Sequence, residues 1–331
     1  MSPNYTVAQV MQHVLLALIP GIAVMLWWFG WGVITNLVLA CVFALLFETL
    51  MLSLRKRPIP PFLSDYSAVL TACLLALALP PYSPWWLIAV GMLFAIVIAK
   101  HLYGGLGYNP FNPAMIGYAA LLVSFPLDMT IWPTATGGFG VLDFSTTLLK
   151  VSGFGVSNWD AYTHATALDS MKMGLNLHQT PQQLMQGNNV GLIGSQGWEW
   201  VNLAYLVGGI WMLYKRVITW HIPVAMLMGL LVLASLFGFS SPTHYPTPLF
   251  HLLSGATMLG AFFIATDPVT ASTTPLGKLV FGFSIGALVY VIRTWGGYPD
   301  AVAFAVIVMN MAVPLIDSYT QPRVYGRKRS L

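Results

Sequence analysis

A series of long apolar runs constrains the fold of this chain more than any other feature. Several of them, such as the run over residues 32–54, reach the roughly 20 residues that a helix needs to cross a bilayer. Only 7% of the residues are charged, against about 25% in an ordinary soluble domain. Inside lipid the backbone must satisfy its own hydrogen bonds, which a helix does. We therefore predict an all-α polytopic membrane protein.

Proline and glycine punctuate the apolar runs and divide them into about ten predicted transmembrane helices. These are expected at residues 13–29, 32–54, 64–80, 84–100, 110–126, 200–214, 219–239, 247–265, 276–293 and 301–317. Four regions follow from this pattern. They are a first membrane half of five helices (1–126), a long connecting segment (127–199), a second membrane half of five helices (200–318) and a basic tail (319–331).

Lysine and arginine fall mainly on one side of this arrangement. If the N-terminus is cytoplasmic, all but Lys150, Lys172 and Arg293 of the 14 basic residues lie on the inner side. Cytoplasmic loops of membrane proteins carry such an excess of positive charge. We therefore expect both termini in the cytoplasm and the 127–199 segment on the opposite side of the membrane. The basic residues are too scattered to predict nucleic acid as a partner.

Two pairs of similar stretches indicate an internal repeat. Leu102-Tyr-Gly-Gly-Leu-Gly-Tyr108 precedes the fifth predicted helix, and Thr294-Trp-Gly-Gly-Tyr298 precedes the tenth. Likewise Ser67–Pro81 resembles Ser254–Pro268. Five helices separate the copies, so the copies must cross the membrane in opposite senses. We predict two inverted five-helix repeats, as in many transporters, with chance similarity between apolar stretches as the alternative.

Several polar residues and both cysteines lie in or near the apolar runs, and their chemistry indicates what surrounds them. A carboxylate such as Glu48 inside a membrane helix costs at least about 2.5 kcal/mol, so we expect it to face a partner, a cavity or an ion path, or to be protonated or near the surface. Arg293 and Asp300 are expected to pair with each other. Cys41 and Cys73 are too few for an iron–sulfur cluster, which needs about four thiolates.

The connecting segment contains Asp160-Ala-Tyr-Thr-His-Ala-Thr166-Ala-Leu-Asp169. This stretch resembles the flavinylation motif of the family that includes the D subunit of the Rnf ion-translocating oxidoreductase complex and the B subunit of the Na⁺-pumping NADH:quinone oxidoreductase. In that motif an Asp leads a Ser/Thr-x-Ala-Thr run. The family usually has glycine where this chain has Ala161 and His164.

The resemblance implies FMN bound covalently to Thr166 through a phosphoester, with Asp160 and Thr163 as motif neighbours. Such an ester needs an accessible hydroxyl, and a nearby carboxylate can hold a metal or position the attacking oxygen. Taken without the resemblance, a threonine in a polar loop is typical of a turn or a helix cap.

Two further stretches extend the resemblance over nearly the whole chain. They are Gly107-Tyr-Asn109-Pro-Phe-Asn112-Pro-Ala-Met-Ile-Gly117 and Ala265-Thr-Asp267-Pro-Val-Thr270-Ala-Ser-Thr-Thr-Pro-Leu-Gly277. Each places amides and hydroxyls where a membrane helix begins or breaks, and such groups can ligate a dehydrated cation or the edge of an isoalloxazine ring. Helix capping by Asn112 and Asp267 is the alternative. The cofactor-binding candidates are thus Asn109, Asn112, Asp267 and Thr270, and the ion-path candidates are Glu48 and Asp267; no metal site is expected.

The resemblance implies an electron relay within a complex that couples ferredoxin/NAD-type redox chemistry to Na⁺ or H⁺ translocation. Such a subunit would not be catalytic alone. It would lie in a bacterial inner membrane with the 127–199 segment in the periplasm. It implies other subunits with iron–sulfur clusters and a second flavin, a periplasmic flavin transferase and the lipid bilayer as partners, and it allows riboflavin as a non-covalent second cofactor here. The alternatives are a passive channel or transporter for a small polar solute, and a structural anchor for redox partners.

Overall fold

The computed structural model describes residues 5–155, 159–185, 191, 194, 196–298 and 300–322. In these ranges the chain is almost entirely helical and includes six helical segments long and apolar enough to cross a membrane, over 7–29, 32–54, 59–78, 221–240, 275–295 and 302–320. The two described strands have two residues each, β1 (Trp132–Pro133) and β2 (Thr163–His164). The prediction of an all-α polytopic membrane protein is confirmed.

Each of the ten predicted spans corresponds to a helix or to a broken helix. In the first half these are α1 (Val7–Phe29), α2 (Gly32–Leu54), α3 (Ile59–Leu63) with α4 (Ser67–Ala78), α5 (Trp85–Met92) with the π-helix η1 (Leu93–His101), and α6 (Pro113–Ser124). In the second half they are α11 (Trp198–Tyr214), α12 (His221–Ser240), α13 (Pro248–Leu253) with α14 (Thr257–Leu259) and the π-helix η3 (Gly260–Ile264), α15 (Pro275–Trp295) and α16 (Val302–Thr320).

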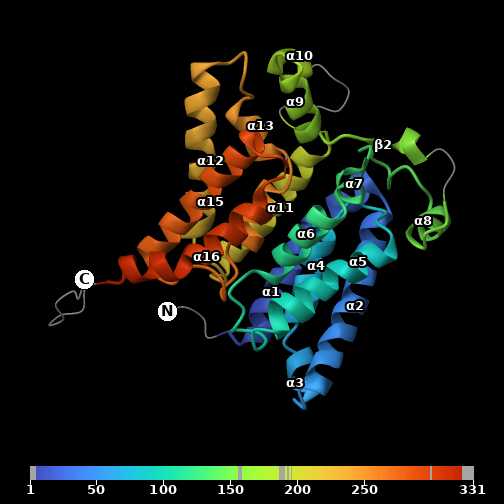
Figure 1. Ribbon diagram of the computed structural model, residues 1–331, viewed down its shortest axis with the longest axis vertical. Helices are drawn as coiled ribbons and strands as arrows, with labels where there is room; N and C mark the ends of the chain where they lie inside the picture. Colours follow the sequence, from blue (N-terminus) through green and yellow to red (C-terminus); the bar gives the residue numbers. More distant parts are fainter. Residues whose placement is uncertain are drawn as a thin grey trace.

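The connecting segment folds into short elements on the opposite side of the molecule from the chain termini (Figure 1). Besides β1 and β2, these are α7 (Pro126–Thr130), α8 (Phe144–Val151), the 3₁₀ helix η2 (Trp159–Tyr162), α9 (Ala167–Asn176) and α10 (Pro181–Leu184). On the side of the termini, the Tyr5 hydroxyl donates to the carbonyl oxygen of Lys215, between α11 and α12. We call these two sides the connecting side and the terminal side.

Helix α2 shows how the sequence selects a buried face in a lipid environment. Every fourth residue along one face is buried, and this stripe consists of Asn36, Ala40, Ala44, Glu48 and Leu52. The opposite face carries exposed aliphatic side chains, namely Val38, Val42, Leu45, Leu46, Leu50 and Leu54. Lipid tails are as apolar as leucine, so small and polar residues mark the protein-facing side of a membrane helix. Glu48 therefore faces protein.

The eighth predicted span is broken, and Arg293 of α15 satisfies backbone groups at the break. Its guanidinium donates to the carbonyl oxygens of His251 and Ser254 at 2.7 and 3.1 Å and to the Thr257 hydroxyl at 3.0 Å. Non-helical backbone at membrane depth requires such partners. Among the described residues no salt bridge joins Arg293 to Asp300, although the two charges still attract each other.

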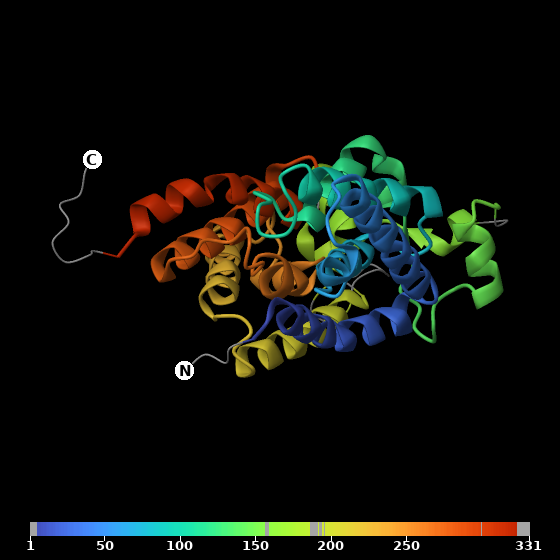
Figure 2. The ribbon, with the colours of Figure 1, turned by 90° about the horizontal axis from the view of Figure 1, so that it is seen from below.

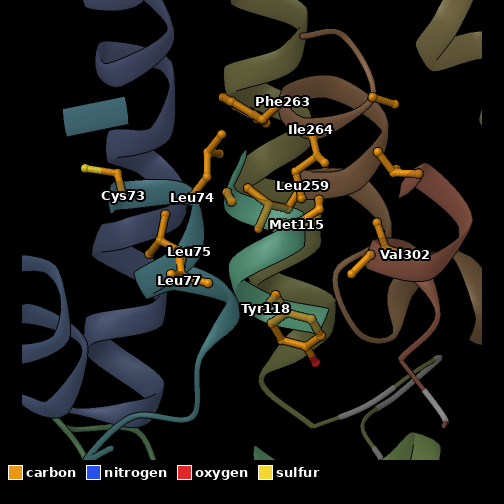
Figure 3. Close-up of a cluster of buried hydrophobic side chains, with 14 of the residues drawn as sticks. Cys73, Leu74, Leu75, Leu77, Met115, Tyr118, Leu259, Phe263, Ile264 and Val302 are labelled. Atoms are coloured by element: carbon orange, nitrogen blue, oxygen red, sulfur yellow. The ribbon is translucent and has the colours of Figure 1, made fainter. Parts of the chain in front are cut away.

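The two halves meet in one apolar core. Side chains of α4 and α6, including Leu74 and Met115, face Leu259, Ile264 and Val302 of α14, η3 and α16 (Figure 3). Seen from below, α12, α15 and α16 lie on one side of the molecule and α2 and α8 on the other (Figure 2). The core therefore joins segments that are distant in sequence, and it fixes the stretches before α6 and after η3 next to each other.

Close packing of α12 against α15 depends on glycines. A Cβ atom added at Gly286 would overlap the carbonyl oxygen of Met226, and one at Gly229 would overlap that of Phe283. Small residues allow membrane helices to approach backbone to backbone, and van der Waals contact is a principal source of stability there.

We expect Gly286→Leu to push α12 and α15 apart and to destabilise the detergent-solubilised protein. Overpacking of this kind typically costs about 1–3 kcal/mol, and a clash with backbone should lie at the upper end. Thermal unfolding followed by tryptophan fluorescence would measure it. Gly297→Leu is the matched control, because a Cβ there meets nothing within 4 Å; equal Tm values for the two variants would contradict the packing argument.

Candidate functional site

Thr166 lies where the short ribbon of the connecting segment turns into helix α9. β1 and β2 pair antiparallel, with Trp132 opposite His164 and Pro133 opposite Thr163. The His164 ring is held by a 2.7 Å hydrogen bond between its Nδ1 and the Thr134 hydroxyl. Thr166 follows in extended conformation as the N-cap of α9. The ribbon thus fixes the start of this helix on the connecting side.

The Thr166 hydroxyl makes two contacts with Asp169. Its oxygen accepts from the Asp169 backbone N–H at 3.2 Å, which is the expected cap. The hydroxyl also donates to Asp169 Oδ2 at 2.6 Å. In a capping box the third residue would instead accept from the backbone N–H of the cap residue, so the carboxylate contact goes beyond capping. Thr166 both caps the helix and presents an oriented hydroxyl.

Asp169 was not singled out from the sequence, whereas Asp160 was. Asp160 lies in η2, and its side chain is outside the described part of the structure. Thr163 lies in β2, half-buried and paired with Pro133. Among the described side chains, the carboxylate that contacts the Thr166 hydroxyl is that of Asp169. The Thr-x-x-Asp spacing at a helix start was the signal that could have found it.

Small pockets flank Thr166 on two sides. One, of about 50 Å³, is also lined by Asp169, Asp300 and Tyr118, and a second, of about 30 Å³, by His164 and Ala165. Trp132 and Trp198 line both pockets, and their ring centroids are 5.1 Å apart. Thr166 therefore borders an acidic pocket, and the aromatic pair belongs to the walls of both pockets.

The electrostatics of the acidic pocket favour a basic carboxylate at Asp169. Burial raises the pKa of Asp169, the hydrogen bond from Thr166 opposes the shift, and the negative charge of Asp300 adds to it. Burial likewise raises the pKa of Asp300. Among the described residues, the Oδ1 atom of Asp300 has no hydrogen-bond partner.

The residues around Thr166 fit a phosphate-linked flavin. Its hydroxyl is half-buried, and its neighbours Tyr162, His164 and Ala165 are exposed. The N-terminus of a helix such as α9, which has ten residues, stabilises a phosphate through its dipole and backbone N–H groups. Aromatic rings such as Trp132 offer stacking surface for an isoalloxazine.

The structure brings the two other motif stretches together on the terminal side. The backbone N–H of Asn112 donates to Asn310 Oδ1 of α16 at 3.1 Å, and Asn310 Nδ2 donates to the Thr270 carbonyl oxygen at 3.0 Å. Asn112 Oδ1 also caps α6 by accepting from the Met115 N–H at 3.3 Å, and its Nδ2 donates to the Ile264 carbonyl oxygen at 3.4 Å. Asn310, which the sequence reasoning missed, is the bridge between the two stretches.

Asp267 and Asn109 lie beside this bridge. The Asp267 carboxylate accepts from the Thr270 hydroxyl at 2.9 Å and from the Val269 N–H at 3.3 Å. Asn109 Nδ2 donates to the Phe111 carbonyl oxygen at 3.0 Å, while its Oδ1 is buried without a partner among the described residues. Asn109, Asn112 and Asp267 all line a cavity of about 510 Å³, which is within the range of small-molecule sites.

We expect Asn310→Leu to destabilise the protein by orphaning two buried groups, the Asn112 N–H and the Thr270 carbonyl. Each group left unpaired costs about 1–3 kcal/mol. A lowered Tm in detergent is the measurement. Asn176→Leu, the same change at an exposed position of α9, should stay within about 0.5 kcal/mol, and a similar loss in both variants would contradict the bridging role.

Glu48 belongs to a buried cluster at the edge of this cavity. Lys100 Nζ donates to its two carboxylate oxygens at 2.8 and 2.9 Å and to the Ser67 hydroxyl at 2.9 Å. His101 Nε2 lies 3.1 Å from Glu48 Oε2. Glu48 and Lys100 are only 1% and 2% exposed. Lys100, which the sequence analysis counted among the basic residues on the inner side, is therefore also the buried ion-pair partner of Glu48. The expectation that Glu48 faces a partner is confirmed; its role in an ion path stays a prediction.

Comparison with known proteins gives consistent matches over nearly the full length. The sequence profile of the NQR2, RnfD, RnfE family matches residues 1–326. A protein of Ectopseudomonas mendocina, described as the D subunit of an ion-translocating oxidoreductase complex, is 55% identical over 324 residues, which cover 97% of this chain and 92% of that protein. Proteins of the same description from Vibrio vulnificus and Escherichia fergusonii are 52% and 50% identical, covering 96% and 97% of this chain and 94% and 95% of theirs.

Proposed function

Because this chain belongs to the NQR2, RnfD, RnfE family, we propose that it carries FMN as a phosphoester on Thr166 and relays electrons. The observation that supports this best is the Thr166 hydroxyl itself. It is oriented by a 2.6 Å hydrogen bond to Asp169 at the N-terminus of α9, next to exposed residues that a transferase can reach. FMN there would supply reversible uptake of electrons, while the protein supplies position and electrostatics.

The chain is a subunit of an ion-translocating oxidoreductase complex, in keeping with the description of its relatives. We infer that it needs the other subunits for activity, including iron–sulfur and second flavin subunits, and that ferredoxin/NAD-type electron transfer is coupled to Na⁺ or H⁺ movement. The complex would lie in a bacterial inner membrane, with the connecting side in the periplasm, where a flavin transferase acts. The excess of Lys and Arg expected on the inner side supports this orientation.

The 510 Å³ cavity on the terminal side is our candidate site for a second, non-covalent flavin such as riboflavin. Its wall offers amides from Asn109 and Asn112 and a carboxylate from Asp267, mixed with hydroxyl-bearing and apolar side chains. Thr270 contributes indirectly, through its hydrogen bond to Asp267. Glu48 and Asp267 remain the candidates for the ion path. An ion at Glu48 would have to compete with Lys100, which already holds both carboxylate oxygens.

Two other functions would use the same helices. A passive channel or transporter for a small polar solute, or a structural anchor for redox partners, needs no covalent flavin. Intact-protein and peptide mass spectrometry of the full chain, expressed with a periplasmic flavin transferase, separates these possibilities. We expect an FMN-sized adduct on the peptide that contains Thr166. An unmodified peptide would favour the transporter or the anchor.

A further inference from the structure

We propose that the Asp169 carboxylate is the proton acceptor for flavin attachment, so that this chain supplies part of the chemistry of its own modification. The proposal rests on the proposed function, because it concerns the ester at Thr166. Its geometric basis is the bond from the Thr166 hydroxyl to Asp169 Oδ2, at 2.6 Å. A nucleophile and its base must lie within such hydrogen-bond reach.

The step balances without any oxidant or reductant. A lone pair of Thr166 Oγ1 attacks the FMN phosphorus of a flavin dinucleotide, whose phosphoanhydride bond breaks. The bond pair leaves with the nucleoside monophosphate, and the hydroxyl proton passes to Asp169 Oδ2. A hydroxyl is a weak nucleophile at its ordinary pKa. A base that is already hydrogen-bonded to the hydroxyl can take up its proton as the oxygen attacks, which makes the oxygen a stronger nucleophile.

The surroundings of Asp169 suit it to this role better than those of an ordinary surface carboxylate. It is half-buried, and Asp300, from the loop before α16, and Tyr118 of α6 line the same pocket. Lys172 of its own helix is the nearby cation. Burial, with Asp300 adding, raises the pKa of Asp169, and a carboxylate of raised pKa is a stronger base.

Helix capping alone does not account for Asp169. The cap bond uses its backbone N–H, which any non-proline residue at this position would provide. The side chain of Asp169 makes a further contact, because its Oδ2 atom accepts a hydrogen bond from Thr166 Oγ1, the atom that would be modified. Asn at position 169 can still accept the hydroxyl proton in a hydrogen bond but cannot take it, so it separates orientation from proton transfer.

The test is the initial rate of FMN incorporation into purified full-length protein made without the transferase. The protein is then mixed with transferase and flavin adenine dinucleotide and sampled by mass spectrometry. Loss of a general base typically lowers a rate about 10²–10⁴-fold, and we expect Asp169→Asn to show a loss in this range, with the adduct still on Thr166. Asp143→Asn, at the exposed N-cap of α8, is the matched control and should leave the rate unchanged.

The pH dependence distinguishes proton transfer from a structural role. The active form is the carboxylate, so the ratio of the wild-type rate to the Asp169→Asn rate should rise with pH through the raised pKa and then level off. Asp300→Asn should move that rise to lower pH, because it removes a neighbouring negative charge. A ratio near one, or a ratio independent of pH, would overturn the proposal. Absence of the adduct from wild type would instead overturn the proposed function.

Discussion

Thr166→Val should abolish covalent attachment of FMN to this chain. Valine has nearly the shape of threonine but lacks the oxygen that would form the ester, so the adduct mass should disappear completely from the intact protein and from the peptide containing residue 166. In-gel flavin fluorescence of the denatured protein should disappear with it. Thr166→Ser retains a hydroxyl and should retain the adduct.

Loss of the helix cap is the other effect of this substitution and needs its own control. Removing a threonine cap costs about 0.5–2 kcal/mol, which could disturb α9. Thr180→Val removes an equivalent cap from α10 in the same connecting segment, where the Thr180 hydroxyl accepts from the Gln183 N–H at 3.4 Å. That variant should keep its FMN. An adduct that survives in Thr166→Val would place the attachment at another residue.

Lys100→Met should destabilise the protein strongly, because it leaves the Glu48 carboxylate buried without its main partner. Removing one member of a buried ion pair costs about 3–5 kcal/mol. His101 remains 3.1 Å from the same carboxylate. We therefore expect a marked loss of Tm in detergent.

The double variant Glu48→Gln/Lys100→Met distinguishes a lost ion pair from lost packing. With both charges gone, no uncompensated charge is buried, and most of the stability should return, as in other replaced buried pairs. Lys215→Met removes an exposed lysine on the terminal side and should have little effect. A double variant no more stable than Lys100→Met would show that the lysine contributes by packing rather than by charge.

Two residues that cap helices in this structure also make a second, separate contact. Asn112 caps α6, as the alternative interpretation of the sequence held, and yet it also contacts Ile264 in the second half. Capping and a place in the cavity wall are therefore compatible at one residue. At Thr166 the same combination of a cap and an oriented hydroxyl occurs on the connecting side.

The sequence by itself determined the lipid environment, the helical class and the approximate positions of the helices and broken helices that correspond to the ten predicted spans. This was possible because the length and apolarity of a run are local properties of the sequence. They decide whether the run can cross a bilayer as a helix. It also singled out Thr166, Asn112 and Asp267, because these residues belong to motifs that are recognised from the order of residues along the chain. The third and eighth predicted spans are broken in the structure, which the apolar pattern did not predict.

Only the tertiary structure decided which polar residues meet. Glu48 and Lys100 are 52 residues apart, and Asn112 and Asn310 are 198 apart, and nothing local marks them as partners. Which residues face each other depends on how the helices cross, and that follows from close contacts such as those of Gly229 and Gly286. The same reason explains Asp300, which the three-dimensional fold brings from the second half to the pocket at Thr166.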